Sequence, residues 1–300
     1  MRANSKGNDF NMLAMLRRRG TRHPARSARQ ILPGRACIAA VLLASALSAA
    51  PAAGPAPAAV LAPHSAHYAV KLLSARSGSN IENVTGDMLI QWEHDCAGWT
   101  MNHKTVFNVA YTTGDGVRIT MTASTWEAET GKDYSFTVRT LFGDSEQTHI
   151  EGHAHRADGG NRVYFSAPEK KEMVLPADVL FPAKHTEKVL DAAADAPAIV
   201  AAKVFDGFTD DGAQLVNAVV GRPIAPGTEG AGGFEGIART RAWPVRLAFF
   251  TGGDEAEPET EMGIKLHENG ISEWLDMDFG DFRIRAQLTK LTVGAQPVCR

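Results

Sequence analysis

Apolar and polar residues alternate with a period of two through most of the chain after residue 63. Across residues 117–124 the odd positions are apolar and the even positions are Arg, Thr or Ser, and residues 281–288 show the same alternation. Because successive side chains of a strand point to opposite faces, each run predicts a half-buried β-strand. Comparable runs occupy residues 67–75, 86–95, 99–111, 134–141, 146–155, 162–166, 171–175, 200–206, 214–220, 245–251, 261–267 and 271–278.

Short turn signals separate these runs. Asp-Gly or Asn-Gly pairs, which favour tight hairpin turns, occur at residues 115–116, 158–159, 211–212 and 269–270. Residues 186–196 have helical spacing instead, and Thr186 is predicted as the N-cap of that helix. The pattern therefore predicts one all-β domain, antiparallel and barrel-like or sandwich-like, with about a dozen or more strands and one short helix.

The first 63 residues have a different character. An arginine-rich stretch precedes an apolar run at residues 36–50, which is too short to cross a bilayer as a stable helix and is typical of a signal peptide. We therefore predict a signal peptide over residues 1–50, with an uncleaved membrane anchor as the alternative. Residues 51–63 are rich in Pro and Ala and predict a solvated spacer. No later apolar run is long enough to span a membrane.

Removing the leader makes the protein acidic. The whole chain carries a formal charge of −3 and residues 1–50 carry +8, so the exported part carries −11. An acidic domain of this size lacks the basic patch of a nucleic-acid-binding protein. We therefore expect no nucleic-acid partner.

The cysteines also indicate export. Cys37 lies in the predicted leader, which leaves Cys96 and Cys299 in the exported domain. An even number of thiols in an oxidising compartment predicts a disulfide. The Cys96–Cys299 bond would close a loop of about 200 residues and contribute at most about 5 kcal/mol in the chain-entropy treatment.

One strand carries a possible metal site. His149, Glu151, His153 and His155 share one face of the strand predicted over residues 146–155, and imidazole and carboxylate groups are common metal ligands. Neighbouring side chains on one strand face are about 7 Å apart, which suits a shared metal poorly. We favour a polar face that points to water, and predict no metal.

Other chemical signals are weak. Asp206, Asp210 and Asp211 crowd a turn, but the glutamate that ends a calcium loop is absent. The sequence has no G-x-S-x-G, His-Glu-x-x-His or P-loop motif. We therefore predict no catalytic residues, no cofactor and no metal, and the ligand-binding residues stay unknown.

Five tryptophans fall in or beside predicted strands, where they either fill the core or line an apolar cleft near the helix. We favour the core. They are Trp92, Trp99, Trp126, Trp243 and Trp274.

Several short segments occur together in a recognisable order. They are residues 96–100, 125–127, 134–136, 180–186, 204–207, 216–221, 268–271 and 279–282, followed by Cys299. In this order they resemble the cell-envelope-integrity EipB family, and the resemblance covers most of residues 64–300. It implies a bacterial periplasmic protein with a spiral-like, barrel-related β-fold, and its paired cysteines match Cys96 and Cys299.

The resemblance also implies a role in maintaining the cell envelope, without assigned catalytic residues. We therefore predict a non-catalytic periplasmic protein that binds an envelope or periplasmic protein, a peptide or an envelope lipid. One alternative is a lipid carrier with an open apolar cleft. The other is a hydrolase or metalloenzyme of unrecognised type.

Overall fold

The computed structural model describes residues 60–227, 233–250 and 257–299, so the predicted leader and most of the predicted spacer lie outside the described residues. The described chain contains fourteen strands and one α-helix, α2 (Pro182–Ala193). No helix in this part of the chain is long and apolar enough to span a membrane. The strands are β1 (His64–Ala75), β2 (Ile81–His94), β3 (Gly98–Tyr111), β4 (Val117–Ala128), β5 (Asp133–Phe142), β6 (Ser145–His155), β7 (Asn161–Ala167), β8 (Lys171–Leu175), β9 (Ala198–Val204), β10 (Gln214–Val220), β11 (Ala242–Phe250), β12 (Thr260–His267), β13 (Ser272–Asp278) and β14 (Phe282–Val293).

All fourteen strands belong to one antiparallel sheet. Strands β1 to β8 pair in chain order, β9 to β14 do the same, and β1 pairs with β14 to join the two halves. The prediction of an antiparallel all-β domain with one short helix is confirmed. Strands β8 and β9 form the two ends of the sheet in the described residues, so the sheet is open, as in a spiral, rather than a closed barrel.

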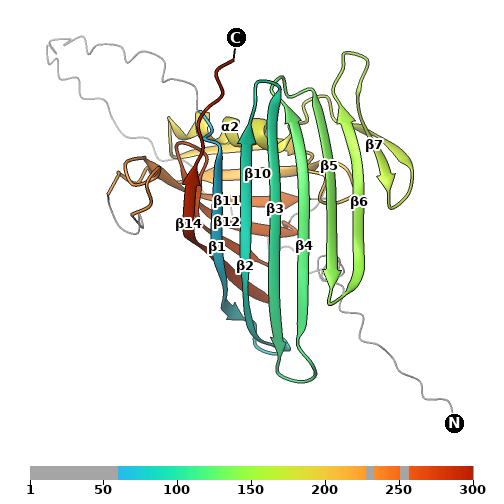
Figure 1. Cartoon of the computed structure of the whole chain (residues 1–300), viewed down its shortest axis with the longest axis vertical. Coiled ribbons are helices and arrows are strands. Elements are labelled where there is room, and N and C mark those ends of the chain that lie inside the picture. Colours follow the sequence, from blue (N-terminus) through green and yellow to red (C-terminus); the bar gives the residue numbers. More distant parts are fainter. Residues whose placement is uncertain (1–59, 228–232, 251–256, 300) are drawn as a thin grey trace, which may run out of the picture. The chain divides into compact units, whose positions relative to one another are not determined.

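One hydrophobic core joins the two halves of the sheet. Strands β2 to β6 lie in front of β10 to β12, which cross behind them, and α2 lies near one end (Figure 1). Trp99 of β3 belongs to the same buried cluster as Val189 of α2 and Trp243 of β11. Burial of these apolar faces against each other therefore holds the sheet in its curved form.

A second core fills the inner side of β5 to β8. Phe136 and Phe165 pack there with Phe205, which follows β9, and the rings of Phe136 and Phe205 meet edge to face at 5.3 Å. Gly207 has φ of +73°, and a Cβ at this position would lie 2.5 Å from Cγ of Phe136. Only glycine lets the backbone pass the ring in this conformation.

The helix begins four residues earlier than the sequence predicted. Its N-cap is Phe181 and Pro182 occupies the first turn, where the missing N–H of proline removes no hydrogen bond. Thr186 lies inside the helix and donates its hydroxyl to the Pro182 carbonyl at 2.9 Å. The prediction of Thr186 as N-cap was therefore wrong.

Candidate functional site

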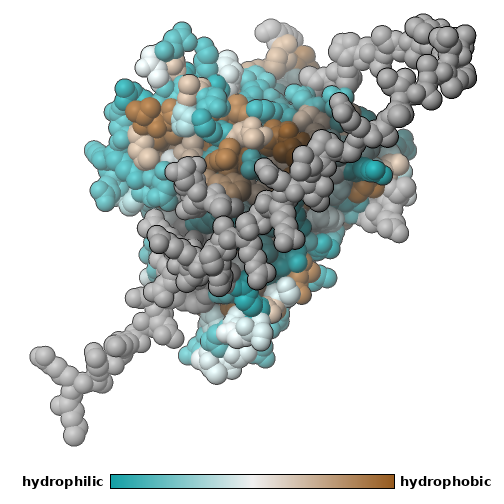
Figure 2. All heavy atoms as spheres, turned by 180° about the vertical axis from the view of Figure 1, so that it is seen from behind, coloured by the Kyte–Doolittle hydropathy of each residue, from teal (hydrophilic) through white to brown (hydrophobic). Residues whose placement is uncertain are grey.

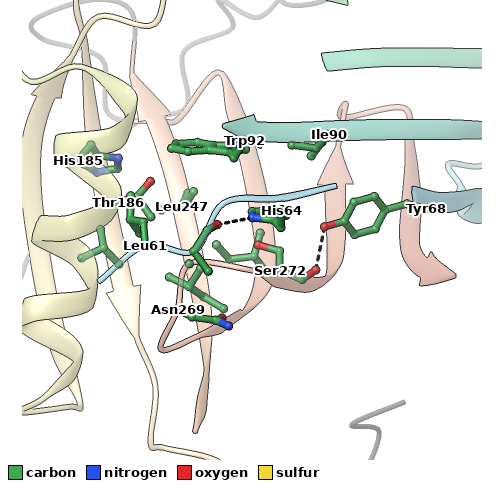
Figure 3. A pocket seen from close by; sticks show the side chains of 15 residues that line it. Leu61, His64, Tyr68, Ile90, Trp92, His185, Thr186, Leu247, Asn269 and Ser272 are labelled. Atoms are coloured by element: carbon green, nitrogen blue, oxygen red, sulfur yellow. Dashed lines mark hydrogen bonds between the residues drawn. The ribbon is translucent and has the colours of Figure 1, made fainter. Parts of the chain in front are cut away.

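An apolar cavity of about 150 Å³ lies where α2 meets β1, β2, β11 and β12 (Figure 3). Helix α2 contributes Val189 to its wall, β2 contributes Trp92, and the β12–β13 turn contributes Gly270. The positive φ of Gly270, +83°, allows this tight turn. Its other aliphatic wall residues are Leu61, Ala62, Ile90, Leu247, Ile264 and Leu266.

Leu61 belongs to the segment that the sequence predicted as a solvated spacer. Its side chain is only 4 % exposed and forms part of the cavity wall. The neighbouring Ala62 N–H donates to the Asn269 carbonyl at 2.9 Å, and the Gln296 side chain donates to the Leu61 carbonyl. The prediction was wrong for this residue, because hydrogen bonds to distant loops hold it against the domain.

His185 is one of the residues that line this apolar space. Its side chain projects from α2 on the side that faces Trp92 (Figure 3). Within the described residues, the buried Nε2 atom of His185 has no hydrogen-bond partner. Burial lowers the pKa of His185 to about 4 and also lowers the pKa of His64 across the cavity. Both rings are therefore neutral at pH 7.

The size of the cavity limits what can enter it. Small-molecule sites in proteins usually measure about 300–1,000 Å³. An engineered apolar cavity of about 150 Å³ accepts benzene. The cavity therefore suits one apolar side chain or the end of an acyl chain.

A buried carboxylate positions the helix beside the cavity. Glu127 of β4 is 3 % exposed and accepts the backbone N–H groups of Ala183 and Lys184 at 2.6 and 3.1 Å. These N–H groups have no partner within a helix, and an anion near them is favourable. Glu127 therefore replaces the side-chain cap that Phe181 cannot provide.

The pKa of Glu127 predicts a pH effect on stability. Burial raises it to about 7, although the two N–H donors and Lys184 oppose the change. The folded protein then binds a proton more tightly than the unfolded chain, so its stability falls as pH rises from about 4.5 to about 7. Relative to Glu127→Gln, the parent should lose up to about 3 kcal/mol of unfolding free energy across this range.

Urea denaturation of the two proteins at closely spaced pH values measures this difference. Taking the difference removes the opposite contribution of His185, whose lowered pKa makes stability fall as pH decreases toward 4. A difference that does not change between pH 4.5 and 7.5 would refute the raised pKa of Glu127.

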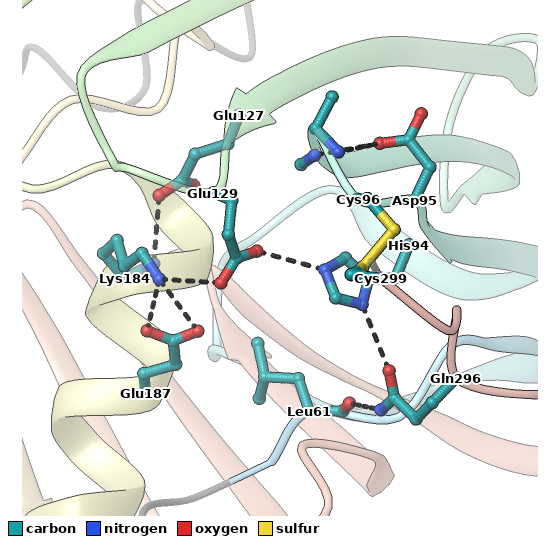
Figure 4. Close-up of polar contacts among 12 residues, drawn as sticks. Leu61, His94, Asp95, Cys96, Glu127, Glu129, Lys184, Glu187, Gln296 and Cys299 are labelled. Atoms are coloured by element: carbon teal, nitrogen blue, oxygen red, sulfur yellow. Dashed lines mark hydrogen bonds and ion pairs between the residues drawn. A yellow bond between two sulfur atoms is a disulfide. The ribbon is translucent and has the colours of Figure 1, made fainter.

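A polar cluster links the helix to the disulfide (Figure 4). Lys184 lies 2.9 Å from Glu187 and 3.6 Å from Glu129. Glu129 also contacts Nε2 of His94 at 3.0 Å, and the His94 ring stacks on Trp99 at 4.1 Å. The cluster therefore connects the base of α2 with the β2–β3 connection that carries Cys96.

The disulfide predicted from the sequence is present. Cys96 and Cys299 are bonded, with 5.5 Å between their Cα atoms. Gln296, three residues before Cys299, contacts Nδ1 of His94 at 3.1 Å. The bond thus attaches the end of the chain to the β2–β3 connection, close to the cavity wall at Leu61.

The histidines of β6 do not converge on one point. His149 lies 3.4 Å from Glu151, His153 stacks on Tyr164, and His155 contacts Asp133 at 2.6 Å. In the described part of the chain, no group of three or more His, Cys, Asp or Glu residues could hold a metal ion.

Asp206 and Asp210, in the acidic turn considered as a calcium loop, each make their own contacts. The side chain of Asp206 accepts the N–H of Phe208 at 3.0 Å, and its carbonyl accepts the Tyr134 hydroxyl at 2.7 Å. Asp210 pairs with Lys171 at 2.6 Å. These contacts fix the turn beside the second core.

The tryptophans were predicted either to fill the core or to line an apolar cleft, and the structure contains examples of both. Trp99 and Trp243 are buried in the core, whereas Trp92 lines the cavity. The structure therefore brings Trp92 and the helix together, as the cleft interpretation required. Sequence reasoning did not identify His185, Glu127 or Leu61. A polar residue at the start of an amphipathic helix was the one available signal, and it pointed to Thr186.

The protein is therefore an all-β protein built from one open, curved antiparallel sheet, with a small apolar cavity between the sheet and its helix. Comparison with known families matches residues 55–295 to the EipB-like family. The chain therefore belongs to the EipB-like family.

Two relatives support this assignment. The chain is 29 % identical over 246 residues to the cell envelope integrity protein EipB of Brucella abortus (strain 2308), a match that covers 81 % of this chain and 88 % of the relative. It also superposes with a TM-score of 0.75 and 27 % identity on the crystal structure of a beta-barrel-like protein of a domain of unknown function from Brucella abortus. That match covers 79 % of this chain and all of the other.

Proposed function

We propose that this protein is exported to the periplasm and maintains the cell envelope as a non-catalytic binding protein. Its ligand would be an apolar side chain of a peptide or partner protein, or the apolar end of an envelope lipid. The apolar cavity between α2 and the sheet carries this proposal. The leader-like sequence, the disulfide and the cell-envelope role of the Brucella relative support it.

The cavity volume favours a binding protein over a lipid carrier. A carrier has to enclose most of an acyl chain, and about 150 Å³ is smaller than the usual site for a whole small molecule. One buried group per binding event is typical of the anchor residue of a peptide or protein partner. We therefore place the peptide or protein ligand first.

Filling the cavity tests the proposal. Leu247 lines the cavity, so Leu247→Trp should occupy the space that a ligand needs. In a strain that lacks the gene, this variant should leave cells sensitive to detergent, whereas the parent gene restores resistance. The matched control is Leu215→Trp on β10, where the side chain is 41 % exposed, and this variant should restore resistance.

Protein level and melting temperature are measured for both variants, so that loss of folding is separated from loss of binding. Equal rescue by the two tryptophan variants at equal protein levels would exclude the cavity as the functional site. Normal detergent resistance of the strain that lacks the gene would count against the envelope role.

A further inference from the structure

A second hollow lies on the face of β2 to β5 that points away from the core. Its volume is about 410 Å³. Two cations line it and no carboxylate does. Its outward-facing lining residues are Leu89, Gln91, Asn102, Lys104, Thr122, Ser124, Thr137 and Arg139.

The strand register arranges this lining in two parallel rows. Leu89 pairs with Lys104, which pairs with Thr122, which pairs with Arg139. The second row contains Gln91, Asn102, Ser124 and Thr137, whose side chains offer amide and hydroxyl groups. Because neighbouring strands lie about 4.8 Å apart, two strand steps place Lys104 and Arg139 about 10 Å from each other.

The charge of the hollow is available for a ligand. Lys104 forms no ion pair among the described residues, and its side chain is exposed. Arg139 has two long contacts, each at 3.4 Å, one to the exposed Glu146 and one to Nε2 of His149. Exposed pairs of this kind contribute little, so an anionic ligand can replace the contact to Glu146. The hollow is thus a local cationic site on a protein whose exported part is acidic.

Aromatic side chains continue the same face. Trp126 follows Ser124 by two residues on β4 and is partly exposed. Tyr164, which is 36 % exposed, stacks on His153, and the register links this pair to Trp126 through Ser135. Aromatic rings with one accessible face bind the apolar faces of sugar rings, while amides and hydroxyls bind their polar edges.

We propose that this hollow binds the cell-wall glycan, a chain of N-acetylated sugars that carries one carboxylate-bearing stem on each repeat. Gln91 and Asn102 would pair with acetamido groups, and Trp126 would stack on a sugar ring. Lys104 and Arg139 would meet carboxylates spaced along the chain. The inference rests on the proposed periplasmic location, but not on the apolar cavity.

The balance of groups in the hollow favours this glycan over phosphate-rich ligands. Uncharged amide and hydroxyl groups outnumber the two cations. Dense phosphate clusters are usually held by several converging arginines or by a helix N-terminus. The N-terminus of α2, the one helix in the described chain, is already capped by Glu127.

Co-sedimentation with purified peptidoglycan sacculi tests the proposal, with titration of a soluble disaccharide–tetrapeptide as the quantitative measurement. Lys104→Glu combined with Arg139→Glu should weaken binding at least tenfold. The matched control reverses Lys203 and Arg246, a lysine and an arginine that are exposed on the other half of the sheet. This control should bind like the parent.

Trp126→Ala should weaken binding without a change of charge, which separates stacking from simple attraction. If the double charge reversal fails to fold, Lys104→Gln with Arg139→Gln provides the same test. Failure of the parent to sediment with sacculi would refute the inference, as would equal losses in both charge-reversal proteins. Equal affinity for a neutral chitin oligosaccharide, or preference for lipopolysaccharide over sacculi, would also refute it. If Leu247→Trp fails to restore detergent resistance and the parent does not bind sacculi, the glycan inference is refuted but the proposed function stands.

Discussion

Replacement of Cys299 by serine should lower the free energy of unfolding by several kcal/mol under oxidising conditions, up to about 5 kcal/mol. The disulfide joins residues 203 positions apart, and a long closed loop strongly restricts the unfolded chain. The loss should also release the C-terminal segment that contacts His94 and Leu61 through Gln296. Denaturation in guanidinium chloride, with and without reductant, measures the effect.

Cys96→Ser is the matched variant for this experiment. Each single variant and the double variant should lose the same amount, because any of them removes the one bond. Reductant should bring the parent to the level of the variants. Equal stability of parent and variants without reductant would show that the disulfide does not stabilise the fold.

Replacement of Glu273 by alanine should cost about 3–5 kcal/mol. Glu273 on β13 lies 2.7 Å from Lys265 and 3.3 Å from His267, and the side chains of Glu273 and Lys265 are 3 % and 5 % exposed. Removal of one partner from a buried pair leaves the other charge without compensation, and this charge has already lost its water. Thermal and urea denaturation measure the loss.

Glu261→Ala provides the control on the neighbouring strand. Glu261 pairs with Arg246 at 3.0 Å, but both side chains are well exposed. Its removal should cost less than about 1 kcal/mol, because water and salt screen an exposed pair. Similar losses for Glu261→Ala and Glu273→Ala would contradict the assignment of the Lys265–Glu273 pair as a buried stabilising contact.

The strands could be predicted because apolar residues at buried positions alternate with polar residues at exposed positions. Val117, Ile119 and Met121 occupy the inward positions of β4, and the same alternation marks most of the other strands. Asn269–Gly270 marks the β12–β13 turn because the turn requires a positive φ. The order of strands within each half of the sheet agrees with the tendency of consecutive antiparallel strands to pair. The pairing of β1 with β14 joins strands far apart in the sequence, and no local pattern predicts it.

The candidate site could be predicted only in part. Trp92 and the helix were visible in the sequence, but the cap of the helix comes from Glu127, fifty-six positions away from Ala183. Local sequence therefore placed the helix start at Thr186, where a suitable side chain exists. The cavity exists because the side chains of Leu61, Trp92 and Leu247, which are far apart in the sequence, leave space between them. No local sequence pattern predicts such a space.

The central claim is that this chain acts outside the cytoplasm as an oxidised binding protein. An intact mass of the protein, purified gently from the periplasmic fraction of its own cells, tests this claim most directly. The account predicts a chain without its leader, two hydrogens lighter than the same chain after reduction. A full-length chain with free thiols in the cytoplasmic fraction would contradict it.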